Sequence, residues 1–317
     1  MTRPDTARLD LAAAERALRG QELAIRRRLD GLLHGDRLGR RTGPGTELDD
    51  VRPYQPAQDD VRRMDWNVTA RAGEPHVRAS IAEPDLTTWV LVDASASMDF
   101  GTAVMEKRDL AVAVVAAVLA LTDRPGNRLG VHLVGGPVPR TFPARPGRRA
   151  AHQLLRELLT SPRAPQGAGR GLDLAAALER MHREHRRPGL RVVVSDLLPR
   201  SPDEPMTWVV PLRRLAARHD VIAVEVTDRR EAVLPDVGPL TLVDPESGRT
   251  TRVHTGDRRL RERYAQAVAA HRAATAAAVR TAGADHVVLR TDRDWVGDVA
   301  RFLAVRRRTA RHRRSVR

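Results

Sequence analysis

The sequence predicts an α/β fold whose central sheet is mostly parallel. From Thr87 onward, short runs rich in valine and leucine alternate with longer segments whose apolar residues recur at helical spacing. Strands that alternate with helices pair in parallel through right-handed crossovers. The chain has 317 residues and a hydrophobic fraction of 41%, which is enough to bury a substantial core. Because only 3% of the residues are aromatic, we expect that core to consist mainly of alanine, valine and leucine.

The position of each apolar run defines the elements of this region. We expect strands at 88–92, 129–134, 138–142, 190–194, 221–226 and 286–289, and helices at 106–121, 148–159, 172–186, 206–217, 260–281 and 295–305. The strands are short apolar runs bounded by turn residues, whereas the helices carry apolar residues three or four apart. Gly135-Gly136-Pro137 stands between the second and third strands and predicts a hairpin there.

The alternation is interrupted once. Residues 240–243 and 250–254 flank the turn sequence Asp244-Pro245-Glu246-Ser247-Gly248, which predicts a second hairpin. We interpret residues 229–258 as an insertion into an α/β domain that spans residues 87–305.

Three further segments complete the expected organisation. Residues 1–34 carry apolar residues at helical spacing and predict an N-terminal helical region. Residues 35–86 begin with a stretch rich in glycine and arginine and form a separate segment. Residues 306–317 are strongly basic, and we expect them to be a solvated tail.

Composition excludes several classes of function. The chain has no cysteine, so it has no disulfide, thiolate zinc site or cysteine nucleophile. Its longest apolar run, Leu110 to Leu121, is shorter than the roughly 20 residues that span a bilayer, and we expect a soluble, cytoplasmic protein. The net charge is +15, but arginines are scattered through every segment. We therefore do not expect nucleic acid to be the partner.

The main chemical signal is Asp93-Ala94-Ser95-Ala96-Ser97, which follows the first expected strand. A carboxylate and two hydroxyls at alternate positions offer three oxygen donors, the type of ligand that Mg²⁺ prefers. Ser195-Asp196 ends a second expected strand. Ligands bind open α/β sheets at the carboxyl ends of the strands, so Asp196 can join the Asp93 loop if the strand order permits.

These residues carry a resemblance to a known family. The segment from Leu91 to Met98 resembles the metal-ion-dependent adhesion site of von Willebrand factor A domains, and the upstream segments 52–56 and 59–71 resemble the signature of the bacterial DUF58 family. The signature residues that we expect to serve packing or interaction are Arg52, Tyr54, Asp59, Asp60, Arg62, Asp65, Trp66 and Arg71. We expect Trp66 to be a core anchor rather than a ligand platform.

The resemblance implies a Rossmann-like von Willebrand factor A-type domain after the signature segment. It also implies Mg²⁺ or Mn²⁺ at Asp93, Ser95, Ser97 and Asp196, and a MoxR-type AAA+ ATPase as the protein partner. The adhesion-site pattern has a threonine in a second loop, where this chain has Leu172. We therefore expect weak metal affinity or a vestigial site.

The sequence favours a non-catalytic, metal-dependent binding module over two alternatives. An aspartyl-nucleophile phosphatase with Mg²⁺ would use Asp93 as the nucleophile, but its acid two residues on is replaced by Ser95, a poor proton donor near neutral pH. A nucleic-acid-binding protein would use the basic tail. His182 and His185 stand three apart on an expected helix among arginines. We interpret them as a solvated face rather than a metal site.

Overall fold

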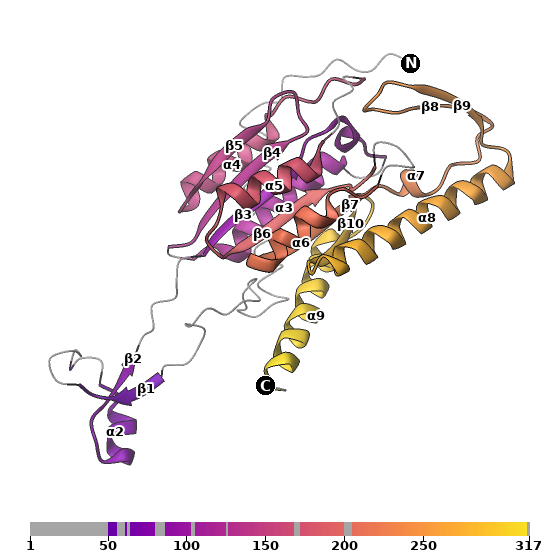
Figure 1. Cartoon of the computed structure of the whole chain (residues 1–317). Coiled ribbons are helices and arrows are strands. Elements are labelled where there is room, and N and C mark those ends of the chain that lie inside the picture. Colours follow the sequence, from indigo (N-terminus) through magenta and orange to yellow (C-terminus); the bar gives the residue numbers. More distant parts are fainter. Residues whose placement is uncertain are drawn as a thin grey trace. The chain divides into compact units, whose positions relative to one another are not determined.

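The computed structural model describes residues 50–55, 61, 64–79, 86–102, 105–124, 126–167, 172–199 and 205–315. The chain divides into two compact units, one formed by Arg40–Asp85 and the other by Met1–Gly39 with Leu86–Arg317 (Figure 1). The expected N-terminal helical region and the signature residues Asp59, Asp60 and Arg62 lie outside the described residues.

The described residues of the smaller unit form two strands and a short helix. β1 (Asp50–Pro53) pairs antiparallel with β2 (His76–Ala79). α2 (Trp66–Ala72) begins at Asp65, whose carboxylate accepts hydrogen bonds from two backbone amides of the first turn. The helix ends at Gly73, where φ is 73°, a left-handed conformation that glycine adopts without steric cost. Capping at both ends therefore defines α2.

The described signature residues take structural positions in this unit. Arg52 lies in β1, and Arg71 lies in the last turn of α2. The backbone amide of Tyr54 donates to the carbonyl of Pro75 at 2.7 Å. Trp66 is 69% exposed, so within this unit it does not anchor a core.

The larger unit is built on a six-stranded sheet, which confirms the predicted α/β class. The strands are β3 (Thr87–Asp93), β4 (Arg128–Val134), β5 (Arg140–Arg145), β6 (Leu190–Ser195), β7 (Asp220–Thr227) and β10 (Asp285–Arg290). Their order is β10-β7-β6-β3-β4-β5, with only the edge strand β5 antiparallel. The chain runs from β3 towards one edge and then returns to start β6 on the other side of β3. This reversal is the topological switch point where doubly wound sheets bind ligands.

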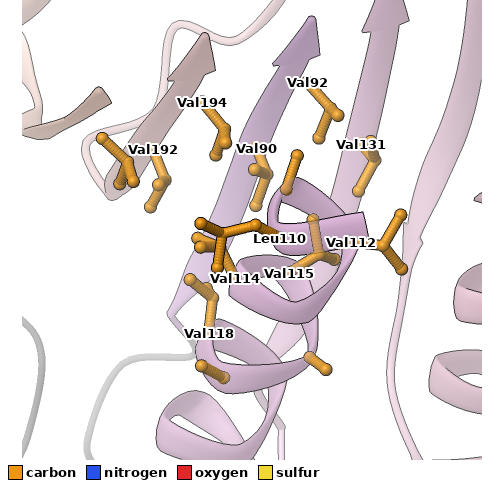
Figure 2. Packing of buried hydrophobic residues seen from close by; sticks show 14 of the residues in the cluster. Val90, Val92, Leu110, Val112, Val114, Val115, Val118, Val131, Val192 and Val194 are labelled. Carbon is orange, nitrogen blue, oxygen red and sulfur yellow. The ribbon is translucent and has the colours of Figure 1, made fainter. Parts of the chain in front are cut away.

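Helices cover both faces of the sheet. They are α3 (Lys107–Thr122), α4 (Arg148–Leu159), α5 (Leu174–Glu184), α6 (Val209–Arg218), α8 (Arg258–Thr281) and α9 (Trp295–Ser315). Alternate residues of β3 enter opposite cores, because successive side chains of a strand point to opposite faces. Val90 and Val92 pack with α3, α4 and α9, as Figure 2 shows for α3. Trp89 and Leu91 pack with α5, α6 and α8.

The expected insertion is present as a helix and a hairpin. α7 (Arg229–Ala232) follows β7 directly, and β8 (Pro239–Val243) pairs antiparallel with β9 (Thr250–His254). The hairpin leads into α8, which Asp257 caps through two backbone amides. In Figure 1 this insertion and α8 are the orange part of the ribbon. The first expected hairpin, between β4 and β5, also forms.

The expected boundary of a basic tail at residue 306 falls inside α9. Arg306 is only 8% exposed, and it forms ion pairs with Asp220 and Asp285, the first residues of β7 and β10. These ion pairs attach the helix to the sheet, so Arg306 is not part of a solvated tail. Within the part of the chain that the structure describes, no helix is both long and apolar enough to cross a membrane.

Candidate functional site

The candidate site lies where β3 and β6 end side by side at the switch point. The two strands are parallel neighbours with Val92 opposite Val194, so the next residues, Asp93 and Ser195, lie at the same edge of the sheet. The hydroxyl of Ser195 donates to Oδ2 of Asp93 at 2.7 Å. The convergence on which the metal hypothesis depends is therefore present.

The loop after β3 folds back onto its own carboxylate. Oδ1 of Asp93 accepts hydrogen bonds from the backbone amide of Ser95 at 2.9 Å and from its hydroxyl at 2.6 Å. The hydroxyl of Ser95 lies 3.1 Å from that of Ser97. The alternate spacing thus gathers three oxygen-bearing side chains, and the third, that of Ser97, lies within the short 3-10 helix η2 (Ala96–Asp99).

Two backbone features allow this close approach. Gly135, just after β4, has φ +80°, and a Cβ there would lie 3.0 Å from both Oδ1 of Asp93 and the amide of Ser95. Leu197, just after β6, has φ 54°, a left-handed conformation that costs energy in a residue other than glycine. Its amide donates to the Ser195 hydroxyl at 3.1 Å. The loops are held in specific conformations around the carboxylates.

Asp196 is held by a buried lysine. The ammonium of Lys107 donates to Oδ2 of Asp196 at 2.8 Å and also to the carboxylate of Glu231 on α7. Lys107 is 0% exposed. The amide of Leu198 donates to Oδ1 of Asp196 at 3.2 Å. Asp196 is therefore oriented from both sides.

The site carries more negative than positive charge. Three carboxylates, of Asp93, Asp196 and Glu231, face the one ammonium of Lys107, which leaves two negative charges when all four groups are ionised. Burial, with the charge of Asp196, raises the pKa of Asp93 to about 7. Burial also acts to raise the pKa of Asp196, but Lys107 outweighs it and the pKa lies below its ordinary value. Among the residues that the structure describes, no cationic side chain pairs with Asp93.

The inserted hairpin supplies a fourth carboxylate at the rim. Oε1 of Glu246, in the turn between β8 and β9, accepts a hydrogen bond from the amide of Ser97 at 2.8 Å. The turn is held against the domain by a bond from the amide of Gly167 to the carbonyl of Pro245 at 3.0 Å. A cavity of about 1050 Å³ lies here, lined by Asp93, Ser95, Ser97, Asp196, Trp208, Leu242, Glu246 and Tyr264 among others.

The donor set fits a small hard cation. Asp93, Ser95 and Ser97 offer oxygen atoms, and Asp196 is a second carboxylate close enough for its charge to act on Asp93. Mg²⁺ needs only one or two carboxylates because it keeps several waters. Leu172 lines the cavity but has no oxygen donor, and neighbouring Asp173 caps α5 through the amide of Ala176. Of the described residues of this loop, Leu172 therefore supplies no side-chain ligand, and Oδ1 of Asp173 is engaged in capping α5.

The structure brings all four predicted ligands together and adds three residues that the sequence did not indicate. The signature residues belong to the other unit. Lys107, Glu231 and Glu246 are the additions. A usable signal existed for Lys107, which is the only lysine of the chain and stands at the start of its most apolar helix. Glu246 lies 149 residues from Ser97 along the chain, so no local pattern connects them.

The interpretation of His182 and His185 as one solvated helix face is wrong for His185. α5 ends at Glu184, and the ring of His185 stacks on Trp89 with 3.7 Å between ring centroids. Nδ1 of His182 is buried and has no hydrogen-bond partner within the described ranges. The helix thus turns this end towards the sheet.

Comparison with known proteins identifies close relatives. A family model described as "Protein of unknown function DUF58" matches residues 50–274. The chain is 51% identical over 310 residues to Uncharacterized protein Mb1516 of Mycobacterium bovis and to Uncharacterized protein Rv1480 of Mycobacterium tuberculosis, which covers 98% of this chain and 94% of theirs. It is 48% identical over 168 residues to Uncharacterized protein MAV169 of Mycobacterium avium, covering 53% of this chain and 95% of that protein.

Solved structures show more distant similarity. A conserved hypothetical protein BatB from Bacteroides thetaiotaomicron matches with a TM-score of 0.40 and 12% identity, over 70% of this chain and 99% of that one. A von Willebrand factor type A structure from Catenulispora acidiphila matches with a TM-score of 0.36 and 14% identity, over 72% of this chain and 42% of that one. The SpRpn10 VWA domain matches with a TM-score of 0.35 and 12% identity, over 67% and 92%.

Proposed function

The chain belongs to the DUF58 family, and on that premise we propose that it is a non-catalytic protein-binding module with a divalent cation at the Asp93 loop. Asp93, Ser95 and Ser97 hold Mg²⁺ or Mn²⁺, and Asp196 adds a second carboxylate. An acidic side chain of a partner then completes the coordination. The bound cation supplies a vacant position that attracts this carboxylate.

One observation supports the proposal most: the carboxylates of Asp93 and Asp196 interact at the switch point, and the buried ammonium of Lys107 pairs with Asp196 but not with Asp93. Buried charges are costly unless they are paired, and Lys107 is already shared between Asp196 and Glu231. A dication beside Asp93 would balance the two remaining negative charges. Lys107 acts as a positioning residue, because it keeps Asp196 ionised and oriented.

The surface charge and the family resemblance suggest the kind of partner. A net charge of +15 accelerates encounters with an acidic protein. The resemblance to the DUF58 family points to a MoxR-type AAA+ ATPase, which would supply ATP hydrolysis. No Walker A sequence occurs in the chain itself, so nucleotide hydrolysis falls to the partner.

A non-catalytic role agrees with the bonding of Ser95. In an aspartyl-nucleophile phosphatase, the residue two positions after the nucleophile protonates the leaving group. Here the Ser95 hydroxyl donates to Asp93 itself, and the Ser195 hydroxyl occupies the other oxygen of that carboxylate.

Metal removal tests the proposal directly. A purified MoxR-type ATPase from the same organism is immobilised, and binding of the chain is measured with Mg²⁺ and with a chelator. We expect chelation to weaken binding by at least about tenfold, since a charge-assisted contact contributes roughly 1.5–3 kcal/mol. Asp93→Ala is expected to match the chelated wild type. The proposal would be rejected if neither chelation nor Asp93→Ala weakened binding to the ATPase. Hydrolysis of p-nitrophenyl phosphate by the wild type, lost in Asp93→Ala, would favour the phosphatase.

Glu246 is expected to compete with the partner's carboxylate. It already accepts a hydrogen bond from the Ser97 amide at the rim of the site, so an incoming acid must displace it. Glu246→Gln keeps the shape of the side chain but removes its charge. We expect partner binding to be about three- to tenfold tighter. This change corresponds to part of the roughly 1.5–3 kcal/mol that a charged hydrogen bond contributes. Equilibrium titration measures the change. Glu262→Gln, on the exposed surface of α8, is the matched control, and weaker binding by Glu246→Gln would contradict competition.

A further inference from the structure

A second cluster of ligand-type side chains lies beside Trp89 of β3 and does not include the Asp93 loop. His132 is in the middle of β4, and His185 follows the last residue of α5. Both imidazoles stack on the indole of Trp89, with ring centroids 4.8 Å and 3.7 Å away. Gly130 allows the indole to lie there, because a Cβ at that position would come within 2.6 Å of the ring. Packing therefore holds both imidazoles beside each other.

The two imidazoles point their Nε2 atoms at each other. The distance between Nε2 of His132 and Nε2 of His185 is 2.7 Å. Nδ1 of His132 lies 3.1 Å from the Thr141 hydroxyl on β5, which orients the ring from its far side. Oε2 of Glu184 lies 3.9 Å from Nε2 of His132, and the three ligand atoms all fall within 4.8 Å of one another.

We infer that His132, His185 and Glu184 form a binding site for a transition metal of the zinc class, separate from the hard-cation site at Asp93. Two imidazole nitrogens and one carboxylate oxygen are a donor set that Zn²⁺ takes, with a fourth position left for water or another ligand. Imidazole donors favour Zn²⁺ over Mg²⁺, which prefers oxygen. The Thr141 hydroxyl is the outer partner that a metal-bound histidine commonly has.

Small rotations bring the ligands to metal-binding distances. At a Zn–N distance of about 2.0–2.1 Å, two tetrahedral nitrogen ligands lie about 3.3 Å apart, so the Nε2 atoms must separate by roughly 0.6 Å. His185 is half-buried and Glu184 is exposed at the end of α5, so these side chains have room to move. His132 is buried and stays as the fixed ligand.

The charges around the cluster act in both directions. Arg180 binds Glu184 at 2.7 Å and must share that carboxylate with a metal. The guanidinium of Arg191 donates hydrogen bonds to backbone carbonyls, those of His185 and Arg187 among them. These bonds hold the segment that follows α5. Burial, with these arginines, lowers the pKa of His132, and burial with the charge of His132 brings the pKa of His185 to about 4.

Metal titration of the full chain tests the inference. The chelator-treated protein is titrated with Zn²⁺ by calorimetry and with Co²⁺ by visible absorption, in a large excess of Mg²⁺ that fills oxygen-only sites. We expect one Zn²⁺ per chain and the intense visible bands of tetrahedral Co²⁺. His185→Ala is expected to weaken Zn²⁺ binding by at least about 100-fold, the upper end of what loss of an outer-shell partner costs, and Glu184→Gln by less.

Three comparisons make the result decisive. Asp93→Asn is expected to keep Zn²⁺ binding, because the two sites are independent, and His182→Ala on the same helix is the control for a nearby histidine. His132→Gln removes the buried ligand, and its fold is checked by circular dichroism against His185→Ala. Absence of Zn²⁺ binding, binding that His185→Ala leaves unchanged, or binding lost in Asp93→Asn would each overturn the inference.

Discussion

Replacing Asp93 with asparagine is expected to weaken Mn²⁺ binding by at least about 100-fold. The asparagine has the same shape and can still accept a hydrogen bond from Ser95, so the loop keeps its conformation. What is lost is one of the two negative charges that no cation in the site balances. One unit charge about 4 Å from another contributes roughly 4 kcal/mol at an effective dielectric constant of 20, which is more than a 100-fold change in affinity.

Electron paramagnetic resonance of free Mn²⁺ measures this affinity without a partner. Asp298→Asn is the matched control, because Asp298 is an acid on α9 whose carboxylate pairs with Arg301 on the surface. We expect this control to bind as the wild type does. Equal Mn²⁺ affinity in wild type and Asp93→Asn would show that the cation does not use this carboxylate, even if partner binding depended on Asp93 for another reason.

The same titration should depend on pH. The pKa of Asp93 is raised to about 7 by burial and by Asp196. Above this pH the carboxylate is ionised and the cation displaces no proton, whereas below it one proton must leave for each cation bound. We therefore expect Mn²⁺ affinity to be constant above pH 7 and to fall by up to about tenfold per pH unit below it, as linkage to one proton requires. Asp93→Asn should show no such slope.

Replacing Lys107 with methionine is expected to lower the free energy of unfolding more than the other substitutions proposed here. Its ammonium is fully buried between Asp196 and Glu231, and methionine fills a similar volume without the charge. Removing one partner of a buried ion pair costs about 3–5 kcal/mol, because the other charge stays buried and unpaired. At about 2–4 °C per kcal/mol for a domain of this size, the melting temperature should fall by roughly 10 °C.

Urea unfolding of three variants isolates the charge effect. In the double variant Lys107→Met/Glu231→Gln, one of the two carboxylates left without the ammonium is also removed. We expect this variant to recover part of the lost free energy of unfolding. Arg258→Met breaks an exposed pair with Glu262 on α8 and should change stability by less than about 1 kcal/mol. A loss as small in Lys107→Met as in this control would mean that the buried ammonium is not needed to hold the carboxylates.

Several elements could be predicted because their signals are local. The alternation of Trp89, Val90, Leu91 and Val92 between two cores is the two-residue period of a strand buried on both faces. The turn around Glu246 carries the residues that hairpins need. The attachment of α9 at Arg306 could not be predicted from the sequence. A run of arginines predicts a solvated tail unless acidic residues from elsewhere in the fold pair with them. Asp220 and Asp285 do so for Arg306.

The sequence by itself determined that a carboxylate and two hydroxyls follow a buried strand, since strand period and loop spacing depend only on neighbouring residues. Only the tertiary structure decided what surrounds them. Ser195 reaches Asp93 across 102 residues, because β6 returns to the far side of β3, and a crossover direction leaves no mark in local periodicity. The same holds for Lys107 beside Asp196 and for His132 beside His185. Each of these contacts depends on which elements the whole core brings together.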